Sequence, residues 1–163
     1  MTLRVAKVLL VFSVAIFYVF VVFNNITDYD SNYQFVRHVL MMDSTFPGNR
    51  GMWRAINSPA WHTVFYLSII LMEAVTMILS LWGGTRLARA VSGTTAEFAR
   101  AKNLAIAGLT LSLLTWFVVF LSVGGEWFLM WQSKTWNGQD AAFRMFTVIG
   151  IVLLFLVQAE GEF

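Results

Sequence analysis

Four long apolar runs constrain the fold of this chain more than any other feature of its sequence. A helix that crosses the hydrocarbon core of a bilayer, about 30 Å thick, needs about 20 mostly apolar residues. Four segments meet this requirement, at residues 3–23, 61–82, 102–123 and 140–158. The sequence therefore predicts an all-α fold, a four-helix transmembrane bundle.

The overall composition supports this prediction. The chain has 163 residues, of which 58% are hydrophobic and 12% are charged, against about 45–50% and about 25% in an average globular domain. A core of this size cannot bury the excess, so lipid must cover part of it. Because no repeat or low-complexity segment divides the chain, we expect one integral membrane domain over residues 1–163. The net charge of +2 is too small to indicate nucleic acid as a partner, and the absence of cysteine excludes disulfides, thiolate metal sites and covalently attached haem.

The first run has two interpretations. Arg4 and Lys7 stand at its start, where their long side chains can reach the membrane surface. A secretory signal peptide also has a basic start and an apolar middle. Residues 20–23 are bulky at the place where small residues should precede a cleavage site, and Asn24 and Asn25 follow them. We therefore favour a retained helix.

The first loop and the middle connection between the second and third runs are both expected to contain structure. In the first loop, residues 24–60, Ser31 followed by Gln34 matches a capping box, and the apolar residues after it recur at helical spacing. This pattern predicts a short helix on the outer membrane interface or on the bundle, with a turn at Pro47-Gly48 to end it. In the middle connection, a turn and cap at residues 92–95 precede Glu97, so the third helix is expected to begin before the membrane.

The distribution of basic residues predicts the topology. Lysine and arginine near helix ends favour the cytoplasmic side. The N-terminal segment and the middle connection together hold six of these residues. The other side holds five, including Arg144 near the start of the fourth run, so the tally alone decides little. The middle connection is short and strongly basic, whereas the first loop offsets its bases with aspartates. We predict that both termini are cytoplasmic and that the first loop and the connection between the third and fourth runs are both periplasmic.

Two blocks of sequence carry a resemblance. The first block is Gly124-Gly125-Glu126-Trp127-Phe128, Met130-Trp131-Gln132-Ser133, Trp136-Asn137-Gly138-Gln139 and Ala141-Ala142-Phe143-Arg144. The second block is Phe35-Val36-Arg37-His38-Val39-Leu40, Met42-Asp43-Ser44-Thr45-Phe46-Pro47-Gly48 and Trp53-Arg54-Ala55-Ile56. Both resemble the signature of a bacterial family of predicted small integral membrane proteins of unknown function. The resemblance covers nearly the whole chain and implies four transmembrane helices but no activity. For a bacterial protein of this kind we expect the inner (cytoplasmic) membrane.

Glu73 is the main candidate for a functional residue inside the membrane. A carboxylate near the centre of a spanning helix costs about 2.5–3.5 kcal/mol on insertion scales. Helical spacing places it on one polar face with His62, Tyr66, Thr76 and Ser80. This face predicts either a proton or ion path, or a hydrogen-bonded glutamate that fixes helix packing, for example against Ser112 or Thr115. We favour packing, because the first run offers few polar groups for a path.

The remaining candidates lie at the outer ends of the helices. Glu126 and Arg144 stand on either side of a short connection, so we predict an ion pair between them. Trp127 and Trp131 are four residues apart, and one helical face could carry both over that pair. Together with Trp136 they could stack on a ligand or anchor the chain in the membrane interface.

His38 and His62 are the two histidines of the chain. They could ligate haem, although we favour hydrogen bonding at the membrane interface for both.

These features favour a non-catalytic accessory or assembly subunit of a larger bacterial inner-membrane complex. The chain is small, has no recognisable catalytic constellation and has aromatic-rich loops suited to contact, so we expect no enzyme activity and no cofactor. The alternative is a small transporter or proton-coupled channel that uses Glu73, and a weaker hypothesis is a redox helper with haem on the histidines. The expected partners are the lipid bilayer and either other membrane protein subunits or further copies of the chain.

Overall fold

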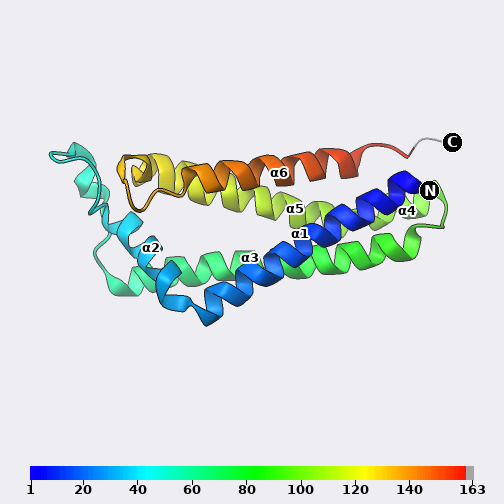
Figure 1. Cartoon of the computed structure of the whole chain (residues 1–163), viewed down its shortest axis with the longest axis horizontal. Coiled ribbons are helices and arrows are strands. Elements are labelled where there is room, and N and C mark those ends of the chain that lie inside the picture. The colour runs from blue at the N-terminus through cyan, green and yellow to red at the C-terminus, as the bar shows by residue number, and fades with distance from the viewer. Residues whose placement is uncertain (161–163) are drawn as a thin grey trace.

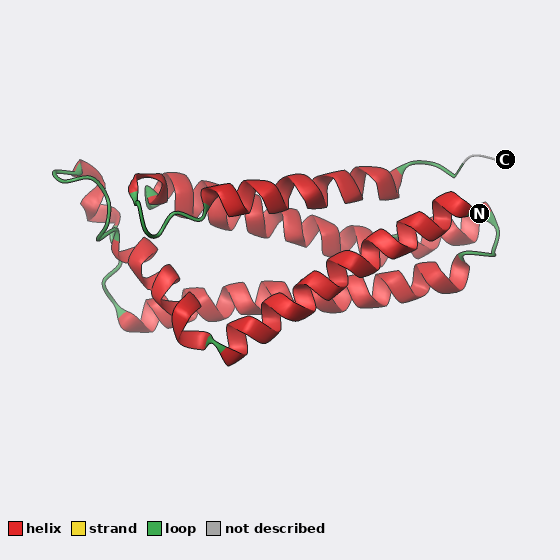
Figure 2. Ribbon diagram, in the orientation of Figure 1, coloured by secondary structure: helices red, strands yellow, loops and turns green. Residues whose placement is uncertain are grey.

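The computed structural model describes residues 1–160, and this part of the chain is a bundle of helices without strands (Figure 2). Four helices are long and apolar enough to cross a membrane. They are α1 (Thr2–Thr27), α3 (Pro59–Ala90), the segment Thr95–Trp127 and α6 (Gln139–Val157). The third consists of α4 (Thr95–Ala101), α5 (Asn103–Leu114) and η2 (Thr115–Trp127). The predicted all-α, four-helix membrane architecture is confirmed.

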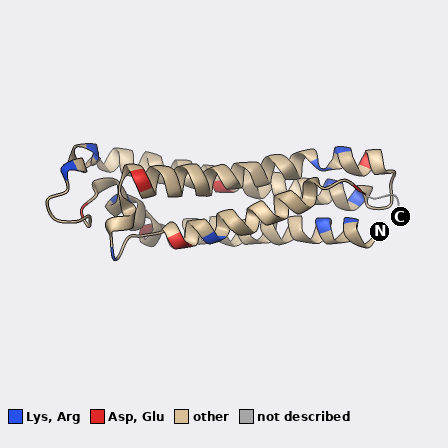
Figure 3. Cartoon of the chain, turned by 90° about the horizontal axis from the view of Figure 1, so that it is seen from above, with Lys and Arg blue, Asp and Glu red and all other residues tan. Residues whose placement is uncertain are grey.

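The four spanning segments run antiparallel to their neighbours along the chain (Figure 1). The start of α1, the α3–α4 connection and the end of α6 lie together, and we call this the terminal end of the bundle. Residues 42–58 and 128–138 lie at the opposite end, which we call the loop end. α1 crosses α3 obliquely and packs mainly against it. Most lysines and arginines lie toward the two ends (Figure 3), as expected where the bundle leaves the hydrocarbon.

The first helix is longer than the sequence predicted. The apolar run stops at Phe23, but α1 continues to Thr27. The extra turn keeps Asn24 and Asn25 helical, and Asn25 is buried against the bundle. Hydropathy marks where side chains become polar, whereas the backbone helix ends only where its hydrogen bonds end.

A short helix follows in the first loop, as predicted, but its start differs from the prediction. α2 (Tyr29–Met41) begins after a single residue, Asp28, and packs against α3. The predicted capping box is wrong, because Ser31 already lies inside α2 and its hydroxyl donates to the Asp28 carboxylate (2.9 Å). α2 ends before the turn at residues 47–48, at Met42 in the left-handed conformation (φ 53°). The chain then passes through η1 (Arg50–Arg54) into α3.

The third spanning segment begins as predicted. Thr94 caps α4 in a reciprocal capping box with Glu97. Farther along, α5 lies very close to α3, because Gly83 and Gly108 carry no side chain at the contact. Small residues of this kind allow helix backbones to approach in membranes.

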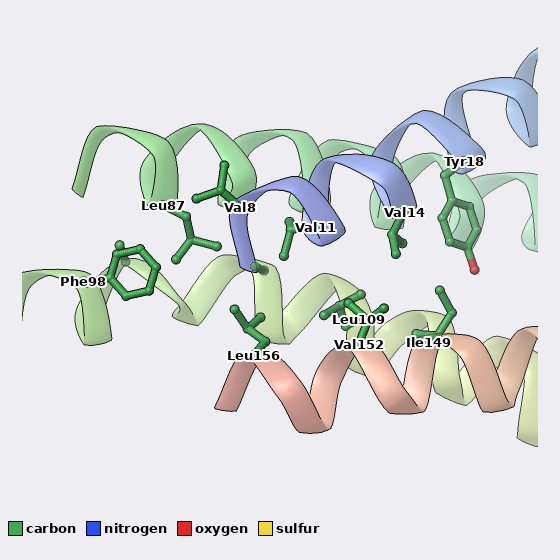
Figure 4. Close-up of a cluster of buried hydrophobic side chains, with 12 residues drawn as sticks. Val8, Val11, Val14, Tyr18, Leu87, Phe98, Leu109, Ile149, Val152 and Leu156 are labelled. Atoms are coloured by element: carbon green, nitrogen blue, oxygen red, sulfur yellow. The ribbon is translucent and has the colours of Figure 1, made fainter. Parts of the chain in front are cut away.

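Two apolar clusters fill the bundle. The cluster nearer the terminal end is shown in Figure 4 and contains Val8, Val11, Val14, Tyr18, Leu87, Phe98, Leu109, Ile149, Val152 and Leu156. The cluster nearer the loop end contains Val36, Val39, Leu40, Met42, Tyr66, Phe128 and Met130. Between the two clusters lies the face of α3 that carries Glu73.

Candidate functional site

The polar face predicted on α3 points into the bundle. Its five members are buried: His62, Tyr66, Glu73, Thr76 and Ser80. The α-helical period of 3.6 residues places them on one side, while the opposite side exposes large apolar residues that suit contact with lipid. A buried glutamate is thus held in the interior of a membrane bundle, with its side chain only 3% exposed.

Asn25 is the hydrogen-bond partner of Glu73. The Asn25 amide Nδ2 donates to Glu73 Oε2 over 2.6 Å. The Tyr66 hydroxyl lies within donating distance of both the Asn25 backbone carbonyl (3.1 Å) and its side-chain oxygen (3.3 Å). This arrangement depends on the last turn of α1, which the apolar run did not reveal.

The predicted contact of Glu73 with Ser112 or Thr115 is wrong. The Thr115 hydroxyl donates to the Leu111 carbonyl of its own helix (2.9 Å). Ser112 instead pairs with the hydroxyl of Tyr18 (2.6 Å), which also accepts a hydrogen bond from the Trp116 indole (3.0 Å). Buried polar groups therefore come from α1, α3, α5 and η2, at several positions along the bundle.

A cavity of about 350 Å³ adjoins Glu73. Its lining includes the exposed residues Asn24, Asn32 and Ala141, which form the mouth, and the buried residues Tyr66 and Glu73, which form the floor. Phe35, Trp116 and Phe120 contribute aromatic wall. The carboxylate therefore faces a chamber that opens beside the α1–α2 junction and the start of α6.

The wall of this chamber includes an unusual helix. η2 is a π-helix of 13 residues, with hydrogen bonds between residues five apart, such as Phe128 N–H to the Val123 carbonyl (2.9 Å). π-helical segments are rare, are mostly one turn long and frequently occur at functional sites. η2 supplies Trp116 and Phe120 to the chamber. No pattern in the apolar run signals this change of helix type.

The comparison with protein families agrees with the fold. A family model described as "Predicted small integral membrane protein (DUF2165)" matches residues 3–159. The chain belongs to this family. The resemblance carried by the two sequence blocks is therefore confirmed, and all four spanning helices lie in or at the edges of the matched range. No curated protein and no solved structure matches the chain.

The ion pair predicted between Glu126 and Arg144 does not form. Both side chains are exposed, and within residues 1–160 no salt bridge joins them. The cause is local: Gly125, not Glu126, faces α6, where a Cβ on it would lie 2.5 Å from the Gln139 amide nitrogen. The absence of a side chain on Gly125 leaves room for the side chain of Gln139.

The three tryptophans near the connection between the third and fourth spanning segments, Trp127, Trp131 and Trp136, do not share a face. The helix ends at Trp127, and Leu129 adopts the left-handed conformation (φ 55°), so helical spacing no longer relates Trp127 to Trp131. Trp127 meets Trp53 edge to face (ring centroids 5.8 Å apart), and Trp131 meets Phe46 (5.7 Å). Each of these two tryptophans therefore connects the end of η2 or the segment after it with the first loop.

Trp136 and the histidines also have partners in the first-loop region. The ring of His38 stacks on Trp136 (4.6 Å), and its Nδ1 lies 2.6 Å from an Asp43 carboxylate oxygen. His62 is buried, with Nε2 2.7 Å from the Ile56 carbonyl. One nitrogen of each ring is thus already hydrogen-bonded, and the interfacial role of both histidines stays a prediction.

A buried ion cluster at the terminal end was not predicted. The sequence favours a frayed tail from Glu160 onward, but Glu160 Oε1 lies 2.6 Å from Lys7 Nζ and 2.7 Å from Lys102 Nζ. The rest of that tail lies outside the described residues. Burial alone would raise the pKa of the Glu160 carboxyl, but hydrogen bonds and positive charge from Lys102 and Lys7 outweigh it and lower that pKa. The cluster joins α1, the third spanning segment and the chain after α6.

Proposed function

We propose that the Glu73 cavity is the working site of a small transporter or proton-coupled channel. The observation that carries this proposal is a membrane-interior carboxylate at the floor of a chamber whose mouth includes exposed Asn24 and Asn32. Ionisable residues in spanning helices commonly mark ion or proton pathways. The proposal assigns no catalytic step to the chain.

The arrangement of polar groups supports a path over simple helix packing. A glutamate that only fixes packing requires one partner and no chamber. Here α1 supplies Asn25 and Tyr18, and η2 supplies Trp116. Polar groups on several helices and at several depths are what a path requires. The expected end of α1 at Phe23 left Asn25 out, and the sequence did not reveal that Tyr18 and Trp116 meet.

The apolar cluster toward the terminal end supports an alternating mechanism. Val11, Val14, Leu109 and Ile149 are buried in the apolar cluster that extends from Tyr18 to Phe98 (Figure 4). The chamber therefore opens toward the loop end and is closed toward the terminal end. Transport would require these residues to separate, as in rocking of one part of a bundle against another.

We further propose an inner-membrane location with the terminal end in the cytoplasm. The support is the basic middle connection, which lies at the same end as the start of α1. In this orientation the mouth of the chamber faces the periplasmic side.

Proton flux through reconstituted protein tests the function. The full chain is placed in vesicles with an internal pH dye, the membrane potential is clamped with potassium and valinomycin, and the outside is acidified. We expect faster internal acidification with wild type than with Glu73→Gln, which keeps hydrogen bonding but carries no titratable proton. Glu126→Gln is the matched control, because Glu126 is exposed at the loop end. Equal rates for wild type and a folded Glu73→Gln variant would contradict the proposal.

The accessory-subunit hypothesis remains a second candidate because of the tryptophans at the loop end. Trp53, Trp127 and Trp131 are exposed there, and tryptophan is enriched both at protein interfaces and at membrane surfaces. Purification from native membranes separates the candidates. Stoichiometric partner proteins would support the subunit, whereas the chain alone or a homo-oligomer would support transport.

A further inference from the structure

We propose that the Glu73 cavity binds a small organic cation, with an ammonium group on Glu73 and an apolar body against the aromatic wall. This inference rests on the proposed function, because it names the ligand class of the same site. The charge, the walls and the size of the cavity all favour such a ligand.

The charge of the cavity favours a cation. Among the described residues that line it, Glu73 is the one with a carboxylate, and none is a lysine, arginine or histidine. Glu73 Oε2 accepts a hydrogen bond from Asn25, whereas no group within residues 1–160 donates a hydrogen bond to Oε1. A buried charge without a counter-charge is costly in a low-dielectric interior. A bound ammonium would supply both the charge and the N–H donor for Oε1.

The walls favour an organic cation over a metal ion. Calcium takes six to eight oxygen ligands and usually several carboxylates, whereas this cavity offers one carboxylate and carboxamide groups. Phe35, Trp116 and Phe120 give aromatic surface instead. Aromatic faces attract ammonium groups, and recognition of such ligands commonly combines rings with a counter-charge.

The size of the cavity limits the ligand. At the roughly 30 Å³ that one water molecule occupies in the liquid, about 350 Å³ holds on the order of ten non-hydrogen atoms. This volume lies at the lower end of the range for small-molecule sites. A monoamine with one ring fits, whereas a lipid or a peptide does not.

Calorimetry with benzylammonium chloride tests the inference. The purified full chain is studied in an uncharged detergent, with benzyl alcohol as a neutral probe of the same shape and benzoate as an anionic one. We expect benzylammonium to bind at least tenfold more tightly than benzyl alcohol, and benzoate not to bind. Glu73→Gln should remove that preference, while Glu126→Gln should keep it. Phe120→Leu should weaken benzylammonium binding several-fold by removing aromatic wall.

The possible outcomes separate failure of this inference from failure of the proposed function. Equal affinity of wild type for benzylammonium and benzyl alcohol would do so without any variant, so the test does not depend on folding of Glu73→Gln. A preference that survives in Glu73→Gln would place the ammonium elsewhere. If Glu73→Gln abolishes proton flux but wild type shows no preference for the ammonium, the proposed function stands and the ligand class is wrong. If the ammonium binds at Glu73 but flux does not depend on Glu73, the site is a receptor and the transport proposal fails.

Discussion

Replacement of Gly83 by alanine should separate α3 and α5, whose backbones lie close together at this glycine. A Cβ at Gly83 would lie 2.5 Å from the Ala105 nitrogen and 2.7 Å from its Cα. Ordinary contact begins near 3.4 Å, so α3 and α5 must move apart by about 0.9 Å. The obstructing atoms are backbone, and no rotamer change can relieve the overlap.

The expected loss of stability follows from two opposing terms. Overpacking of a well-packed interior costs about 1–3 kcal/mol, and we expect the upper end because the contact is with backbone. Alanine is favoured over glycine in a helix by about 1 kcal/mol. The net destabilisation of Gly83→Ala should therefore be about 2 kcal/mol. It should also loosen the neighbouring contact of Gly108 with Ser80, where a Cβ would lie 3.0 Å from the hydroxyl oxygen.

Gly150 provides the matched control in α6. A Cβ there would meet nothing closer than the Leu113 side chain at 3.9 Å. Gly150→Ala should stabilise the protein by up to about 1 kcal/mol through helix propensity alone, so the two variants should differ by about 3 kcal/mol. The free energies are measured by unfolding in mixed micelles with increasing dodecyl sulfate, followed by tryptophan fluorescence. If Gly83→Ala proves as stable as Gly150→Ala, the close approach of α3 and α5 does not exist.

Three further predictions follow from the ends of the bundle. Glu160→Gln should lower the free energy of unfolding by about 1–3 kcal/mol at neutral pH. The wild-type protein should lose the same increment as the pH falls below about 4.5. The reason is that a carboxyl whose pKa is lowered in the folded state stabilises that state only while it is ionised. A pH-independent difference in melting temperature between the two proteins would contradict the ion cluster. A topology reporter fused after Phe163 should be cytoplasmic and one inserted near Asn49 periplasmic, and the reverse pattern would invert the proposed orientation. Arg54→Ala should remove the hydrogen bond to the Trp127 carbonyl (2.9 Å) and two cation–π contacts, which should lower the free energy of unfolding by about 1–2 kcal/mol. Limited proteolysis of residues 42–58 should then become faster. An unchanged rate of cleavage would show that this contact does not hold the first loop against η2.

The sequence alone determined the four spanning helices and the buried face of α3. Both depend on periodicity and hydropathy within one segment. An apolar run of sufficient length is stable as a spanning helix in lipid, wherever the other helices lie. A single polar face must turn toward the bundle, because lipid offers its side chains no hydrogen-bond partner. The sequence also predicted the cap at residues 92–95 before Glu97, which the structure forms as a capping box between Thr94 and Glu97.

The tertiary structure decided which side chains meet. Glu73 was expected to contact α5, yet its partner is Asn25, because an extra turn of α1 and the crossing of α1 over α3 bring the amide to the carboxylate. Glu126 and Arg144 were expected to pair from their places in the chain, but the rotation of each helix exposes both. The rotation of each helix about its axis and its position along the bundle depend on packing between helices, as at Gly83 and Ala105. Such contacts join residues that are far apart in the sequence.

The chamber and the ion cluster have the same physical origin. The π-helical turns of η2 bring Trp116 and Phe120 to the chamber, and the chain after α6 brings Glu160 to two lysines from other helices. Each site combines residues from several segments of the chain, and no single segment indicates that they meet. Hydropathy fixes which segments cross the membrane, but only the packing of those segments against one another creates a carboxylate with a cavity beside it.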